Sequence, residues 1–119
     1  VTKQVIVIPN SEVTIAATAP KSYAYCANTK FDETLVDKIK GVDLLYHEST
    51  YLQAHEDKAN MYFHSTTRQA ATIAKKAEVS KLLIGHFSSK YEKLDEFLSE
   101  AKAVFENTEL ALEGISYKL

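Results

Sequence analysis

From residue 31 onward, segments with the pattern of a strand alternate with segments with the pattern of a helix. Residues 42–46 and 81–85 are short, almost continuous apolar runs, as expected for buried strands. Residues 70–77 and 94–105 instead repeat their apolar side chains at the three- and four-residue spacing of one helical face. This alternation predicts parallel strands joined by helical crossovers, and therefore an α/β fold.

The amino-terminal part of the chain has a different pattern. Residues 5–8, 13–17 and 23–26 are each typical of a short strand, and turn-forming residues and prolines separate them. Short strands that are neighbours in the sequence usually pair in antiparallel fashion. We therefore expect a mixed sheet with antiparallel strands at its amino-terminal end, within a single unit over residues 1–119.

Composition excludes several classes of protein. With 14 Lys and Arg against 16 Asp and Glu, the formal net charge is −2, so contact with a nucleic acid would have to rely on a local patch. No apolar run approaches the ~20 residues of a membrane helix. The single cysteine rules out an internal disulfide, and we expect a protein of the reducing cytoplasm with no membrane contact.

Polar side chains follow three of the expected strands and precede the alanine-rich helix. The four clusters are Asn28-Thr29, His47-Glu48-Ser49-Thr50, His64-Ser65-Thr66-Thr67 and His86-Phe87-Ser88-Ser89-Lys90-Tyr91. In open parallel sheets, ligands bind beyond the carboxyl ends of the strands. If the topology is right, three of the four histidines lie on one edge of the sheet, and His55 is the one left on the surface.

Each cluster also has a purely structural interpretation. Ser65 or Thr66 would be an ordinary helix cap, and His47 with Glu48 would be a pair that braces the sheet edge. Asn28 would begin a turn. A histidine such as His86 is, by itself, more often structural than a ligand. The clusters favour a catalytic site only when they are taken together.

The chemistry that suits such clusters is metal-assisted hydrolysis. Imidazole and carboxylate groups hold Zn²⁺, and a second histidine backed by a glutamate acts as a general acid. A catalytic zinc needs about three protein ligands, and the chain has no His-x-His pair. We therefore expect that this chain alone does not complete a metal site.

The four clusters resemble, in order, the motifs of the ribonuclease Z family, the tRNA 3′-processing endoribonucleases of the metallo-β-lactamase superfamily. The segment 23–29 is similar to the strand that ends in the family's Asp-Thr, and the segment 47–50 is similar to its His-Glu-Ala-Thr motif, with Ser49 in place of Ala. The segment 86–91 carries Lys90 where the family has Arg. The resemblance implies the carboxyl-terminal half of an αββα sandwich.

The resemblance also implies roles for individual residues. His86 matches a ligand of the second metal, and Asn28 stands where the family has the aspartate that bridges two zinc ions. His64 matches the catalytic histidine that protonates the departing 3′ oxygen, Glu48 is its supporting carboxylate, and His47 belongs to the same motif. Because a neutral amide bridges two cations poorly, Asn28 predicts weak dinuclear zinc binding.

Four further residues match positions near the scissile phosphate: Ser65, Thr66, Ser88 and Tyr91. The implied substrate is precursor tRNA, and the implied cofactor is zinc. In the family the His-x-His-x-Asp-His metal motif and the tRNA-binding arm lie upstream, and neither occurs in this sequence. We therefore expect a carboxyl-terminal half that is inactive alone and that forms a homodimer through its exposed sheet.

Two other interpretations remain open. One is a different hydrolase of the same fold, such as an arylsulfatase-like enzyme or another phosphodiesterase. The other is a degenerate, non-catalytic dimerisation module, in which Asn28 marks a lost activity. The sequence upstream of the motifs would distinguish them.

Overall fold

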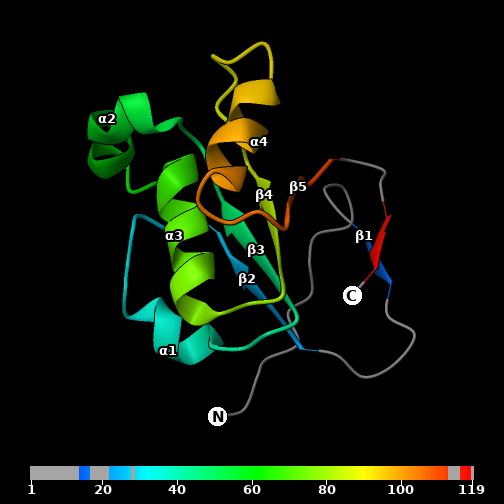
Figure 1. The fold of residues 1–119 in the computed structure, drawn as a ribbon. Coiled ribbons are helices and arrows are strands. Elements are labelled where there is room, and N and C mark those ends of the chain that lie inside the picture. The colour runs from blue at the N-terminus through cyan, green and yellow to red at the C-terminus, as the bar shows by residue number, and fades with distance from the viewer. Residues whose placement is uncertain (1–13, 17–21, 28, 113–115, 119) are drawn as a thin grey trace.

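The computed structural model describes residues 14–16, 22–27, 29–112 and 116–118, and the fold is an α/β arrangement of a parallel sheet and helices (Figure 1). The main sheet has the strand order β2-β3-β4-β5 and every pairing in it is parallel. Its strands are β2 (Tyr23–Cys26), β3 (Leu44–Glu48), β4 (Lys81–Gly85) and β5 (Thr108–Leu110). The helices are α1 (Leu35–Ile39), the 3-10 turn Gln53–His55, α2 (Glu56–Met61), α3 (Thr67–Ala77) and α4 (Asp95–Lys102).

The expected antiparallel lead-in is wrong for the strands that the structure describes. β1 (Thr14–Ala16) pairs in parallel with β6 (Ser116–Lys118), in a separate two-stranded sheet. β2 pairs in parallel with β3 because α1 carries the chain back along the sheet between them. The strand expected at residues 5–8 lies outside the described residues.

Helix α3 is the helix that packs most closely on the sheet, and it contacts β3, β4, α1 and α4 (Figure 1). It begins at a capping box, in which Thr66 accepts from the Gln69 amide and the Gln69 side chain accepts from the Thr66 amide. Its buried face carries Ala70, Ile73, Ala74 and Ala77, as the helical spacing predicted, and Ala71 is buried in addition. Small side chains let the helix axis approach the strands closely, which holds the start of α3 beside the end of β3.

The two faces of the sheet bury different clusters. Leu45, Leu82 and Ile84 pack with the helices, whereas Leu44, Tyr46 and Leu83 form a second cluster on the opposite face. In that second cluster Tyr25 and Tyr46 stack with ring centroids 4.6 Å apart. No helix among the described residues is long and apolar enough to cross a bilayer.

Gly85 ends β4 where the sheet leaves no room for a side chain. A Cβ atom at this position would lie 2.6 Å from the hydroxyl of Tyr46, which is itself almost fully buried. Because Gly85 has no side chain, the end of β4 can pair closely with the end of β3. This pairing brings residue 86 to the end of β3.

Candidate active site

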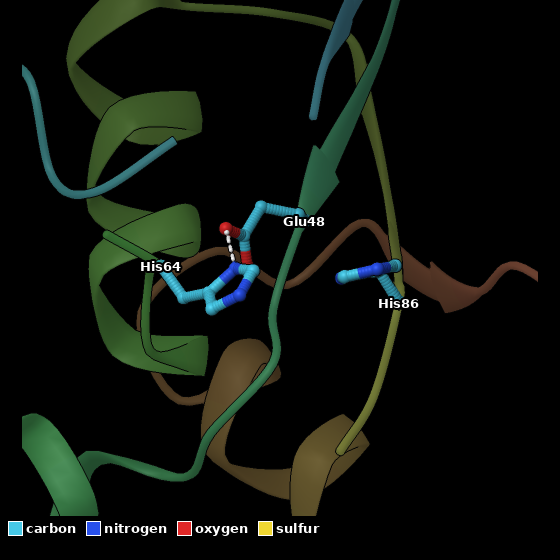
Figure 2. Close-up of side chains that lie close together, drawn as sticks. All are labelled: Glu48, His64 and His86. Carbon is cyan, nitrogen blue, oxygen red and sulfur yellow. Dashed lines mark hydrogen bonds and ion pairs between the residues drawn. The ribbon is translucent and has the colours of Figure 1, made fainter. Parts of the chain in front are cut away.

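The carboxyl ends of β3 and β4 and the segment before α3 meet at one place (Figure 2). There Glu48, His64 and His86 each offer a ligand atom, and these three atoms lie within 4.8 Å of one another. Figure 2 shows the three side chains pointing toward the same space, Glu48 from the end of β3 and the two histidines from opposite sides. Three of the residues predicted from the sequence are thus brought together.

Glu48 is the buried centre of this group. Its Oε1 atom accepts from the Thr29 amide at 3.1 Å and lies 2.8 Å from His64 Nδ1. Its Oε2 atom accepts from the amide and the hydroxyl of Thr50, at 3.1 and 2.7 Å. The side chain is completely buried. Four hydrogen bonds fill the acceptor sites of this carboxylate and hold it in one orientation.

His64 is oriented by that carboxylate. A carboxylate only accepts hydrogen bonds, so the proton between the two groups belongs to His64 Nδ1. This leaves Nε2 as the atom free to exchange a proton with a substrate. The His64 side chain is 21% exposed, so the ring is held from its buried side and open on the other. Orientation by a buried acid with access to solvent is the arrangement that general acid–base catalysis needs.

His86 is oriented by a second, equally directional contact. The Thr50 hydroxyl donates its only proton to Glu48, so it accepts from His86 Nδ1, which is 3.1 Å away. The lone pair of His86 then sits on Nε2. The residue is exposed and has a positive φ of 62°, a backbone conformation uncommon for histidine. A hydrogen bond that fixes the tautomer of a histidine is typical of metal ligands.

The donor set fits a metal ion only in part. His86 presents an oriented, unprotonated Nε2 atom, which suits zinc. The Glu48 carboxylate is already committed to four hydrogen bonds, so its geometry suits the support of His64 rather than coordination. Asn28, the other residue predicted to be a ligand, lies outside the described residues. The described residues therefore provide one well-prepared ligand and one acid–base pair.

His47 does not join this group, although it precedes Glu48. It lies within β3, where successive side chains point to opposite faces, and its ring is completely buried. Nδ1 lies 2.8 Å from the carbonyl oxygen of Glu48, and Nε2 is buried without a hydrogen-bond partner among the described residues. Burial lowers the pKa of His47 below its usual 6.5. The structure therefore places a neutral histidine inside the sheet.

Ser65 and Thr66 hold the loop in which His64 lies. The Ser65 hydroxyl donates to the carbonyl oxygen of Thr29 at 2.5 Å, and the Thr66 hydroxyl donates to Gln53 at 2.6 Å. Both side chains are fully buried. The capping role considered for Thr66 is confirmed, and both residues act on the site through the backbone positions that they fix.

Ser88 and Tyr91 brace the segment after His86. The Ser88 amide donates to the carbonyl oxygen of Thr50 at 2.9 Å. The Tyr91 hydroxyl lies 2.7 Å from His55 Nδ1 and accepts from the Leu52 amide at 3.2 Å. His55, expected on the surface, is only half-exposed and belongs to this contact. Tyr91 thus links the two loops that flank the site.

Sequence reasoning missed what Thr29 and Thr50 do. Both are present in the clusters at the strand ends, but nothing in their spacing indicated that they bind Glu48. Thr50 is the link between the acid–base pair and His86. A hydroxyl two residues after a buried carboxylate at a strand end is the only available signal, and many turns share it.

No protein-family model matches the chain, whereas individual relatives match it closely. Ribonuclease Z of Cytophaga hutchinsonii is 50% identical over 106 residues, which are 89% of this chain and 34% of that protein. Ribonuclease Z of Parabacteroides distasonis is 48% identical over 115 residues, or 97% of this chain and 38% of that protein. The chain thus spans little more than a third of the length of these relatives.

Solved structures share the fold. The metallo-beta-lactamase fold protein YhfI of Bacillus subtilis matches 80% of this chain and 39% of its own, with a TM-score of 0.74 and 24% identity, which shows the fold alone. A long form RNase Z from yeast matches 76% of this chain and 12% of its own, at a TM-score of 0.66 and 25% identity. Human tRNase Z, short form, matches 67% of this chain and 26% of its own, at a TM-score of 0.53 and 32% identity. With the motifs, the fold and the relatives in agreement, the chain belongs to the ribonuclease Z family, as a segment of a metallo-β-lactamase fold.

Proposed function

We propose that this chain is the carboxyl-terminal part of a zinc-dependent endoribonuclease that removes the 3′ trailer from precursor tRNA by hydrolysis of a phosphodiester bond. The observation that supports this proposal is the contact between His64 Nδ1 and the completely buried Glu48 carboxylate, at 2.8 Å. An oriented imidazole with one open nitrogen is suited to donate a proton to the 3′ oxygen that leaves. The names of the similar proteins, ribonuclease Z and tRNase Z, supply the class of substrate.

In this mechanism the chain's own residues bind and move protons. Glu48 holds His64 with Nε2 open to the substrate, and its negative charge stabilises the imidazolium, which carries a proton on each ring nitrogen. As the oxygen of a water-derived hydroxide bonds to phosphorus, the P–O bond to the 3′ oxygen breaks, and Nε2 gives its proton to that departing oxygen. Thr29 and Thr50 keep the carboxylate fixed during this step. Because these groups are already in place, little reorganisation is needed when the proton moves.

His86 is the residue of this chain that we propose as a zinc ligand, through Nε2. When bound, zinc supplies Lewis acidity toward the phosphodiester oxygens. The remaining ligands lie outside the described residues. Asn28, in the place of a bridging carboxylate, should weaken the binding of a second zinc ion, and a zinc titration of the full-length protein that gives two tight sites would contradict this.

The proposal extends to the setting of the enzyme. We place the enzyme in the cytoplasm, together with its precursor tRNA substrate. The reducing environment there keeps thiols free, and the single cysteine, Cys26, is a half-buried free thiol. Burial raises the pKa of that thiol to about 11, so it is unreactive. We also propose a homodimer, and sedimentation equilibrium of the protein measures it directly.

The test is cleavage of a precursor tRNA by the full-length enzyme that carries this segment, with zinc bound. His64→Ala should lower kcat by about 10²- to 10⁴-fold, the usual contribution of a general acid, while the zinc content stays unchanged. Glu78→Ala is the control, because Glu78 is exposed at the end of α3 and pairs with Lys40, away from Glu48, and its kcat should stay within about threefold of wild type.

Two outcomes would contradict the proposal. Equal loss of activity in both variants would mean that the His64–Glu48 contact has no special role. A zinc-loaded wild-type enzyme that leaves the 3′ trailer intact would favour the non-catalytic interpretation of this fold.

A further inference from the structure

Three large apolar side chains lie exposed immediately before His64. Met61, Tyr62 and Phe63 are 65%, 57% and 64% exposed, and they connect the end of α2 to the catalytic loop. Among the described residues, Leu112 is the one other large hydrophobic residue that is exposed. Isolated exposed apolar residues are ordinary, but three in succession beside an acid–base pair call for an explanation.

The backbone of this segment is held in an unfavourable conformation. Phe63 has a φ of 59°, in the left-handed region that a bulky aromatic residue rarely adopts. The amides on either side are fixed, because Tyr62 N donates to Lys58 O at 3.0 Å and His64 N donates to Ala59 O at 2.8 Å. Backbone strain that the surrounding structure maintains is found most often at functional sites. Here the strained backbone keeps the Phe63 ring in solvent next to His64.

A cation accompanies these rings. The Lys30 ammonium lies 5.5 Å from the centre of the Phe63 ring, and Lys30 is exposed. An exposed cation beside exposed aromatic rings is the combination found on surfaces that bind single-stranded nucleic acids.

We infer that Tyr62 and Phe63 are a stacking platform for an unpaired base of the RNA substrate beside the scissile phosphate, with Lys30 contacting an adjacent phosphate. This inference rests on the proposed function and adds to it the residues that position the RNA. Stacking accepts any base, because every base has an aromatic face. A platform one residue from the general acid places the neighbouring nucleotide in register with His64 Nε2.

The experiment compares variants of the full-length, zinc-loaded enzyme that carries this segment. Phe63→Leu keeps the apolar volume and removes the ring, whereas Phe63→Trp keeps a ring. Phe63→Leu should raise KM for precursor tRNA by roughly tenfold, with kcat within about twofold, and Phe63→Trp should stay near wild type. On a substrate with abasic nucleotides on both sides of the cleavage point, the effect of Phe63→Leu should disappear.

Lys30→Ala tests the charge, and Lys40→Ala is its matched control. Lys40 is an exposed lysine at the end of α1, where its partner is Glu78. Lys30→Ala should raise KM about threefold and reduce the dependence of KM on salt, because one phosphate contact is lost. Lys40→Ala should change neither quantity. Equal effects of the two variants would exclude a local phosphate contact.

Other results would overturn the inference without touching the proposed function. Normal cleavage by Phe63→Leu with an unchanged KM would exclude stacking. A lower unfolding temperature or an altered sedimentation coefficient for that variant, again with an unchanged KM, would identify a packing or protein–protein surface instead.

If the wild-type enzyme does not cleave precursor tRNA, a binding experiment tests the stacking platform separately. This segment contains no tryptophan, so Phe63→Trp introduces a fluorescent reporter into it. Quenching by a single-stranded oligoribonucleotide, compared with the unsubstituted protein, would support the platform although the proposed activity had failed. The absence of quenching would overturn the platform as well.

Discussion

The end of β3 and the segment that follows α2 meet at His64, and they are opposite in character. At the end of β3, Glu48 and Thr50 are buried and joined by directional hydrogen bonds. The segment of residues 61–63 is apolar, exposed and strained. Hydrogen bonds in the first region fix the proton on His64 Nδ1, whereas the second region is the surface that we infer contacts the substrate. The comparison shows that the acid–base residues are held rigidly by hydrogen bonds, whereas the segment beside them is open to solvent.

The largest effect should come from the rigid side. Glu48→Gln replaces acceptor atoms with an amide group that faces donors at Thr29, Thr50 and His64. Loss of the correct His64 orientation should lower kcat by about 10²- to 10⁴-fold in the full-length enzyme. The measurement is single-turnover cleavage of precursor tRNA, with Glu78→Gln, at an exposed position, as the control. A kcat close to that of wild type would show that the buried region is only structural.

A smaller effect should come from the link between the two histidines. Thr50→Val keeps the shape of the side chain and removes the hydroxyl that orients His86. Zinc affinity, measured by competition with a chelator, should fall by about tenfold, the usual result of removing a hydrogen bond to a metal-bound histidine. Thr50→Ser keeps the hydroxyl and should bind zinc like wild type. Identical zinc affinities for Thr50→Val and Thr50→Ser would show that the Thr50 hydroxyl does not support zinc binding through His86.

The smallest effect concerns stability and pH. Because the pKa of His47 is lowered in the folded protein, the unfolded chain binds a proton below pH 6.5 that the folded chain does not. Through His47 alone, the protein should therefore lose up to about 1.4 kcal/mol of unfolding free energy per pH unit below that point, and little above it. His47→Asn removes this group, so urea unfolding at pH 6.5 and 5.5 should show a loss about 1 kcal/mol smaller. Equal losses would mean that His47 is protonated in the folded state.

Much of the fold could be predicted from local pattern. The apolar runs at β3 and β4 are strands, and the alanine stripe of α3 is buried as its spacing requires. Strand orientation failed at β1 and β2, because it depends on which strand is the neighbour. β1 finds its partner in β6, at the other end of the chain, and no local pattern carries that information.

The candidate site, like the fold, was predictable from the sequence only in part. Its residue types and their place at strand ends were determined by the sequence alone, since parallel topology gathers the carboxyl ends of strands at one edge. The family resemblance implied that Glu48 supports His64, and the structure shows that contact, whereas only the tertiary structure decided that His47 is buried inside the sheet. The physical reason is that successive side chains of a strand take opposite sides, and contacts from distant segments, here Thr29 and the loop before α3, decide which side becomes the site.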